Sequence, residues 1–206
     1  MTKPIAIIAG EPNSISSEII FKTWKLRKRY THKPWLVIGS IKLLNLQKNK
    51  LKYHFRIKEV KSNFTKKDLS GSELPVYNIE YKQKKPFQKI SSRSNKYIFN
   101  SFNTTINFIK NKKILGVINC PVSKETLFRN EYQGITEFLS KKTGTKEGDA
   151  VMLIYNKKLS VSPLTTHIPL GQISKKINKL KIVKKVKIIN NFYKKFFKKN
   201  PNIAIL

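Results

Sequence analysis

Cysteine is almost absent from this sequence of 206 residues, in which Cys120 stands alone. A single cysteine excludes an intrachain disulfide and a cysteine-rich zinc site. Long apolar runs are lacking too, because the stretches at residues 5–9 and 35–38 are far too short to span a bilayer. The apolar stretch near the N-terminus is also too short for a signal peptide. We therefore expect a soluble protein of a reducing compartment, the cytoplasm, with no membrane partner.

Arginine is scarce although the chain is strongly basic. Only five of the 43 basic residues are Arg, the rest are Lys, and the formal net charge is +32. Proteins that read nucleic acids favour Arg for bidentate and stacking contacts, whereas these lysines are spread along the whole chain among many Asn and Ile. The pattern favours a solvated basic surface that reflects compositional bias, with no specific nucleic-acid partner. A surface that binds polyanions is the alternative.

Several catalytic signatures are missing as well. The sequence contains neither G-x-G-x-x-G nor G-x-x-x-x-G-K-[ST], so a classical dinucleotide-binding fold and a P-loop are unsupported. The three histidines, His32, His54 and His167, do not assemble a Ser-His-Asp or Cys-His set. We expect His32 and His54 to be surface residues. No base is placed beside Cys120, which we expect to be a small buried apolar residue rather than a nucleophile. The catalytic residues therefore stay unknown.

The chain does contain a regular alternation of short apolar runs and helical patterns. Strands are predicted at residues 4–9, 35–39 and 114–119, with weaker ones at 53–60 and 75–80. Helices are predicted at 14–30, where Ser14 is the candidate cap, and at 41–48 and 91–111. This alternation predicts an α/β fold.

The last third of the sequence gives three further expectations. Residues 150–155 and 159–166 predict the arms of a β-hairpin around Asn156-Lys157. Residues 172–199 predict one long amphipathic helix that packs on a sheet, and a helix lying on a membrane surface is the alternative. Residues 201–206 read as the start of a buried strand. Because a buried parallel strand normally leads into a functional loop, we expect the sequence to be cut short at its C-terminus.

Three segments contain candidate functional residues. Gly10-Glu11-Pro12 follows the first strand, where α/β proteins place ligand loops, although a plain turn is the alternative. Lys124 follows the strand at residues 114–119, where its ammonium group is suited to a phosphate or a carboxylate. His167 ends a β-type run after Thr165 and Thr166, so its neutral imidazole is a candidate metal ligand. A hydrogen-bonded structural histidine is the alternative for His167.

Taken together, these segments resemble the 4-hydroxythreonine-4-phosphate dehydrogenase family. The family's P-G-E-P-x-G-I-G-x-E loop corresponds to residues 9–18 of this sequence, and its G-P-V-x-K segment corresponds to residues 120–124. Its G-H-T-E motif corresponds to Gly134-Ile135-Thr136-Glu137, and its T-T-H-x-P-L motif matches residues 165–170 in full. The order and the spacing agree along the whole chain, which spans the first part of the family's length.

The resemblance implies a fold, an activity and partners. The fold is an isocitrate/isopropylmalate dehydrogenase-like α/β layered sheet with flanking helices, here incomplete at the C-terminus. We expect residues 1–118 to belong to a first domain and residues 119–206 to an incomplete second domain with the substrate and metal motifs. The family works as a homodimer. It uses NAD or NADP and a divalent metal (Zn, Mg or Co) to oxidise 4-phosphooxy-threonine, a small phosphorylated substrate, with decarboxylation, on the pathway to pyridoxal phosphate.

The same resemblance assigns Thr136 and Lys124 to substrate binding and His167 to the metal. Ser14 and Ser16 replace glycines of the family loop, and Ile135 replaces a histidine that contacts substrate. A paralogue that acts on a related phosphorylated hydroxy acid is therefore an alternative. Only His167 matches the family's three metal histidines. We accordingly expect residues 1–206 alone to be inactive and poorly stable.

Overall fold

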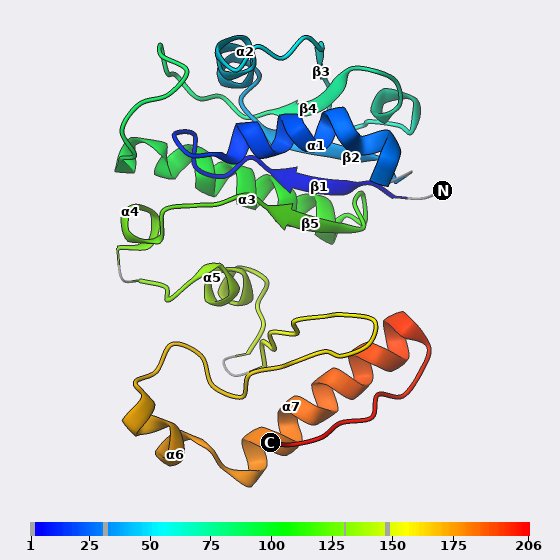
Figure 1. The fold of residues 1–206 in the computed structure, drawn as a ribbon, viewed down its shortest axis with the longest axis vertical. Coiled ribbons are helices and arrows are strands. Elements are labelled where there is room, and N and C mark those ends of the chain that lie inside the picture. Colours follow the sequence, from blue (N-terminus) through cyan, green and yellow to red (C-terminus); the bar gives the residue numbers. More distant parts are fainter. Residues whose placement is uncertain (1–2, 31–32, 130, 147–148) are drawn as a thin grey trace. The chain divides into compact units, whose positions relative to one another are not determined.

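The computed structural model describes residues 3–30, 33–129, 131–146 and 149–206. Within them the chain forms two compact units, Met1–Arg129 and Asn130–Leu206 (Figure 1). The first unit contains a β-sheet with helices on both faces, and the second consists mainly of helices and irregular segments. The domain boundary expected at residue 118 stays a prediction.

The sheet of the first unit has five strands: β1 (Ile5–Ile8), β2 (Trp35–Gly39), β3 (Ile57–Glu59), β4 (Leu74–Asn78) and β5 (Gly116–Asn119). Their order is β3-β4-β2-β1-β5, and every neighbouring pair is parallel. All five strands lie where the apolar runs predict them. The predicted α/β class with a parallel sheet is therefore confirmed.

Burial explains why the central strands were recognisable from the sequence. Every residue of β2 is buried, because α/β packing covers both faces of a central parallel strand. In the register of the sheet, Ile8 of β1 lies between Ile38 of β2 and Asn119 of β5. The side strands β3 and β5 are less buried, and their sequences are correspondingly more polar.

Two helices cover one face of this sheet: α1 (Ser16–Tyr30) and α2 (Ile41–Lys50). Phe21 and Trp24 of α1 are buried against the strands, and the rings of Trp24 and Trp35 meet edge to face with centroids 5.0 Å apart. The resulting apolar cluster contains Ala9, Ile20, Phe21, Trp24, Trp35, Val37, Leu44, Leu74, Val76 and Cys120.

Helix α3 (Asn95–Lys110) covers the opposite face (Figure 1). Its Ile98 and Phe102 are buried, and the Phe108 ring packs edge to face against Tyr77 of β4 with centroids 5.1 Å apart. A 3-10 turn at Ser92–Ser94 precedes the helix. The helix predicted at residues 91–111 is thus present with one face buried, although Ile109 near its end is 41% exposed.

The connections create a switch point at β1. The chain leaves β1 through α1 to reach β2 on one side, and it returns from β4 through α3 to reach β5 on the other side. The two crossovers therefore lie on opposite faces of the sheet, and the segments after β1 and β5 meet at its carboxyl edge. Ligands of open parallel sheets bind in the crevice formed there.

The second unit contains α5 (Ile135–Lys142), α6 (Ile173–Lys176), α7 (Lys179–Phe192) and a π-helical turn at Tyr193–Phe197. The predicted single helix over residues 172–199 is wrong, because the chain is extended at Ile177 and Asn178. The Asn178 side chain accepts a hydrogen bond of 3.0 Å from the Lys181 amide and begins a new helix.

The β-hairpin and the C-terminal strand that were predicted in this unit do not form as predicted. The hairpin is reduced to one antiparallel bridge between Ile154 and Val161, and residues 201–206 are irregular instead of forming a strand. The apolar sequences suit strands, but a strand also needs hydrogen-bonded neighbours. Among the described residues beyond 130, no sheet is present to receive them, and Phe138 is the one large apolar side chain that is fully buried.

A helix that crosses a bilayer must be both long and predominantly apolar. Within the ranges described above, no helix is both long enough and apolar enough to cross a membrane.

Candidate functional site

The loop that follows β1 lies directly against the segment that follows β5. Gly10 has a φ of +71°, and a Cβ atom added there would lie 2.4 Å from the Pro121 carbonyl oxygen. The Glu11 amide donates a hydrogen bond of 2.9 Å to that same oxygen. Only glycine combines a left-handed backbone with so close an approach. We call residues 9–16 and 120–124 together the switch-point site.

Glu11 is the buried carboxylate of the switch-point site. It is 1% exposed, its Oε2 atom accepts a hydrogen bond of 2.9 Å from Ser94 Oγ, and its Oε1 atom accepts one of 3.2 Å from the Asn13 amide. Burial raises the pKa of this carboxyl group above its ordinary value, and the bonds from Ser94 and Asn13 act in the opposite direction. Through these two hydrogen bonds the buried Glu11 side chain stabilises the conformation of the loop.

The two serines that replace family glycines are part of this bonding. Ser14 Oγ donates to the Glu11 carbonyl oxygen at 2.9 Å and accepts from the Ser16 amide at 3.2 Å. Its Oγ also lies 2.6 Å from Ser16 Oγ. Ser14 therefore satisfies an amide at the start of α1, which agrees with its predicted capping role. Around positions 14 and 16 the loop is therefore held by side-chain hydrogen bonds, whereas Gly10 still supplies its left-handed backbone.

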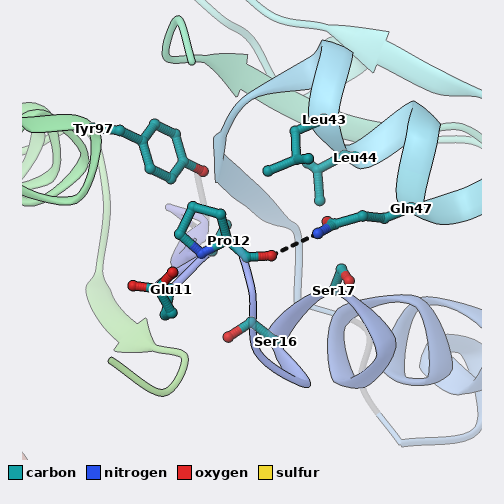
Figure 2. A pocket seen from close by; sticks show the side chains of 9 residues that line it. Glu11, Pro12, Ser16, Ser17, Leu43, Leu44, Gln47 and Tyr97 are labelled. Atoms are coloured by element: carbon teal, nitrogen blue, oxygen red, sulfur yellow. Dashed lines mark hydrogen bonds between the residues drawn. The ribbon is translucent and has the colours of Figure 1, made fainter. Parts of the chain in front are cut away.

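A small cavity lies beneath the loop (Figure 2). Its volume is about 10 Å³, which is enough for one water molecule and far too small for a substrate. Gln47 Nε2 donates a hydrogen bond of 2.6 Å to the Pro12 carbonyl oxygen (dashed line, Figure 2). The residues around this cavity thus support the loop, and the cavity itself is not a substrate site. The lining residues are Ala9, Glu11, Pro12, Ser16, Ser17, Leu43, Leu44, Gln47 and Tyr97.

Lys124 lies at the exposed end of the switch-point site, as the first residue of the short helix α4 (Lys124–Phe128). Ser123 caps this helix by accepting a hydrogen bond from the Thr126 amide at 3.4 Å. Asn95 Nδ2, at the start of α3, donates to the Thr126 carbonyl oxygen at 2.7 Å. Lys124 is therefore a solvated cation on a fixed backbone beside the Glu11 loop.

Cys120 is buried and belongs to the apolar cluster. Burial raises the pKa of its thiol to about 11, so the reactive thiolate is scarce at neutral pH. The prediction that Cys120 is a small buried apolar residue is confirmed.

Thr136 and His167, the two remaining predicted site residues, lie in the second unit. Thr136 is a half-buried residue in the first turn of α5, directly after Ile135. His167 is exposed and lies in an irregular segment, so its predicted place at the end of a strand is wrong. Its φ of +56° lies in the left-handed region, which several exposed lysines of the chain also adopt.

The structure does not bring a metal-binding group together around His167. Across the described ranges, no cluster of three or more His, Cys, Asp or Glu side chains could hold a metal ion. The site assignments for Lys124, Thr136 and His167 therefore stay predictions.

The sequence reasoning missed the side chains that support the switch-point site. Ser94 and Gln47 reach Glu11 and Pro12 from segments 83 and 35 positions away. Asn13 Oδ1 similarly accepts hydrogen bonds from Gln83 Nε2 at 2.9 Å and from the Gln88 amide at 2.8 Å. The sequence contains no local signal for such pairs, because polar residues of this kind are equally common on solvated surfaces.

The sheet order and the position of the switch-point site define an α/β protein of the type that binds small ligands at the carboxyl ends of parallel strands. The family model described as "Pyridoxal phosphate biosynthetic protein PdxA" matches residues 31–206. The chain belongs to this family, as the sequence motifs predicted.

Two curated relatives are named 4-hydroxythreonine-4-phosphate dehydrogenase. The protein from Sulfurihydrogenibium sp. is 34% identical over 206 residues, which cover 98% of this chain and 62% of the relative. The protein from Aquifex aeolicus is 32% identical over 212 residues, which cover 100% of this chain and 62% of the relative. The chain thus spans less than two thirds of the length of these relatives.

Solved structures agree on the fold. A 4-hydroxythreonine-4-phosphate dehydrogenase from Klebsiella pneumoniae superposes with a TM-score of 0.81 at 21% identity, covering 93% of this chain and 59% of that one. One from Burkholderia phymatum superposes with a TM-score of 0.79 at 20% identity, covering 93% of this chain and 58% of that one. The predicted layered sheet with flanking helices is therefore the fold of this chain.

Proposed function

We propose that this chain belongs to a dehydrogenase that oxidises 4-phosphooxy-threonine, with decarboxylation, in pyridoxal phosphate biosynthesis. The observation that carries the proposal is the family match over residues 31–206, together with relatives of 34% and 32% identity that are named for this activity. The names of the relatives favour this activity over a paralogous dehydrogenase and over binding of nucleic acid. We expect the protein to be cytoplasmic and to act as a homodimer.

The residues of the switch-point site supply the binding part of this proposal. The Lys124 ammonium group is exposed beside a fixed loop, where it can neutralise a phosphate or carboxylate of the substrate. The buried contacts of Glu11 hold the neighbouring loop in one shape before a ligand arrives. Preorganisation of this kind reduces the entropy lost on binding.

The segment that begins at Gly134 supplies the second group of contacts. Thr136 offers a hydroxyl that can donate to or accept from a polar substrate group. Ile135 next to it replaces a family histidine with an apolar side chain and removes one polar contact. We propose that substrate recognition here relies more heavily on Thr136 and Lys124 than it does in relatives with the histidine.

The metal and the nicotinamide cofactor are only partly accounted for by these residues. A catalytic metal normally has three protein ligands, but the family resemblance assigns only His167 to the metal, and the described residues contain no cluster of three or more possible ligands. These residues do not fit a complete metal site, so no catalytic step is assigned to a metal. We propose His167 as one contributor to a site for Zn, Mg or Co, and NAD or NADP as the oxidant.

A chimaeric protein tests the proposal. Residues 1–206 would be joined to the C-terminal remainder of the Sulfurihydrogenibium relative, and NADH or NADPH formation from 4-phosphooxy-threonine would be followed with added metal. We expect turnover in the chimaera and none in residues 1–206 alone. If the chimaera is folded and dimeric but does not turn over with either cofactor and any of the three metals, the proposed activity is wrong.

A further inference from the structure

A second, larger pocket lies at the other end of the sheet. Pro34 and Trp35 mark the amino end of β2, whereas the switch-point site follows the carboxyl ends of β1 and β5. The pocket has a volume of about 430 Å³, which is in the range of small-molecule sites. We call it the tryptophan pocket. Its lining residues are Trp24, Arg27, Lys28, Lys33, Pro34, Trp35, Lys66, Leu69, Ser70 and Gly71.

The charge of this lining has one sign. Arg27, Lys28, Lys33 and Lys66 contribute four cationic side chains, and none of the described lining residues is Asp or Glu. The turn beside it contains Asp68, but this carboxylate already accepts hydrogen bonds from Thr65 and from Lys58 Nζ. The described lining is therefore positively charged, and concave surfaces concentrate such a field.

Arg27 is held in place before any ligand binds. Its Nη1 and Nη2 atoms donate to the carbonyl oxygens of Trp24 at 2.7 Å and Gly71 at 3.2 Å, and its guanidinium carbon lies 3.8 Å from the centroid of the Trp24 ring. These contacts join the end of α1 to the 70–71 turn and orient a cation whose charge they do not neutralise. A guanidinium ordered in this way loses little entropy when it binds an anion.

The walls of the pocket are apolar and aromatic. Trp24 and Trp35 are 3% and 6% exposed, and Leu69 is 7% exposed. Rigid apolar walls with a few cations at the mouth suit a compact organic anion better than a long polymer. Lys28 and Lys66 are exposed at the mouth, where they can reach an anionic group.

We propose that the tryptophan pocket binds a small phosphorylated compound, with its phosphate groups held by Arg27, Lys28 and Lys66. This second site is independent of the proposed dehydrogenase activity, because none of its residues belongs to the switch-point site. Phosphate oxygens match the ammonium and guanidinium donors, and charge-assisted bonds of this type are the strong ones.

Both tryptophans of the chain line this pocket, so a ligand bound there lies next to both fluorophores. The 206-residue chain would be titrated with inorganic pyrophosphate at constant ionic strength. We expect a saturable change in fluorescence. The double variant K28A/K66A should raise the dissociation constant about tenfold, whereas K25A/K50A, which removes two exposed lysines outside the lining, should change it less than about twofold. Circular dichroism would show that both variants are folded.

Three results would overturn the proposal. The first is the absence of a saturable change with pyrophosphate and with ADP. The second is equal weakening in K28A/K66A and K25A/K50A, which would mean that total charge alone attracts the anion. The third is a single-stranded oligonucleotide that binds more tightly than either small phosphate and loses this binding in K28A/K66A, which would make the pocket part of a polynucleotide surface.

Discussion

The hydroxyl of Ser94 lies 2.9 Å from the carboxylate of Glu11, although 83 positions separate the two residues in the sequence. The same hydroxyl is 2.9 Å from the Ser91 carbonyl oxygen, but an ionised carboxylate is the stronger acceptor. Glu11 belongs to the loop after β1, and Ser94 ends the turn before α3. Their contact ties together the two crossovers that diverge at the switch point.

Ser94→Ala should destabilise the first unit by about 1–3 kcal/mol, because it leaves a buried carboxylate without one of its donors. Urea unfolding followed by tryptophan fluorescence measures this unit, since Trp24 and Trp35 both lie in it. The matched control is Ser92→Ala, an exposed serine of the same turn, which should change the unfolding free energy by less than about 0.5 kcal/mol. Equal effects of the two changes would contradict the role of the Ser94 contact.

The raised pKa of Glu11 predicts a specific pH dependence. Burial raises this pKa above 4.5 in the folded protein. At pH values between 4.5 and the raised pKa, the folded state therefore binds more protons than the unfolded chain. The contribution of Glu11 to the unfolding free energy is fully present below pH 4.5, and it is lost as the pH rises from 4.5 through the raised pKa. The unfolding free energy of the parent protein minus that of Glu11→Gln should therefore fall as the pH rises. In a Ser94→Ala background the window should extend to higher pH. A flat difference would refute the assignment.

Gly10→Ala should cost at least about 2 kcal/mol of unfolding free energy. Alanine is disfavoured at a φ of +71°, and its Cβ would lie 2.4 Å from the Pro121 carbonyl oxygen. The control is Gly116→Ala in β5, where an added Cβ meets nothing within 4 Å. We expect that change to be neutral or slightly stabilising. A mild effect at Gly10 would mean that the two loops of the switch-point site are not in contact.

Hydrogen exchange should separate the two units. Helix α3 has seven buried residues, whereas α7 has none. Amides of α3 should exchange more slowly than those of α7 by about two orders of magnitude, because protection follows buried apolar contacts. This pattern would also support the expectation that residues 1–206 alone are poorly stable. Similar protection of the two helices in this chain would show that the second unit has a stability of its own.

The role of His167 can be tested in the chimaera described above. His167→Ala should lower metal-dependent turnover more than about 100-fold if this side chain is a ligand. His54→Ala is the matched control, because His54 is also exposed but lies in the first unit. Metal affinity should be measured alongside by calorimetry. Unchanged affinity and turnover in His167→Ala would remove this residue from the metal site.

The first unit was predictable because its strands are short apolar runs between helical patterns. Residues of β1 and β2 pair along four positions, and both strands are recognisable from their sequences alone. Helix α3 was visible because Ile98, Phe102 and Ile106 recur at helical spacing. Each of these patterns is local in the sequence. The tertiary structure provides the neighbouring strand or the sheet face against which the apolar residues pack.

The second unit was less predictable for the opposite reason. The sequences at residues 150–166 and 201–206 have strand character, yet one bridge is all that forms. Strand propensity depends on neighbouring strands and on burial. The predicted long helix is interrupted because the Asn178 side chain caps a new helix instead of extending the previous one.

The sequence by itself determined the parallel α/β class, the family and the motifs after β1 and β5, since each depends on local residue patterns. Only the tertiary structure decided that Gly10 packs closely against the Pro121 carbonyl group and that Ser94 donates a hydrogen bond to Glu11. It also decided that both tryptophans line one pocket with basic side chains. These features join residues that are distant in the sequence. Their geometry depends on which helices cover which face of the sheet, and packing of the whole unit fixes that choice.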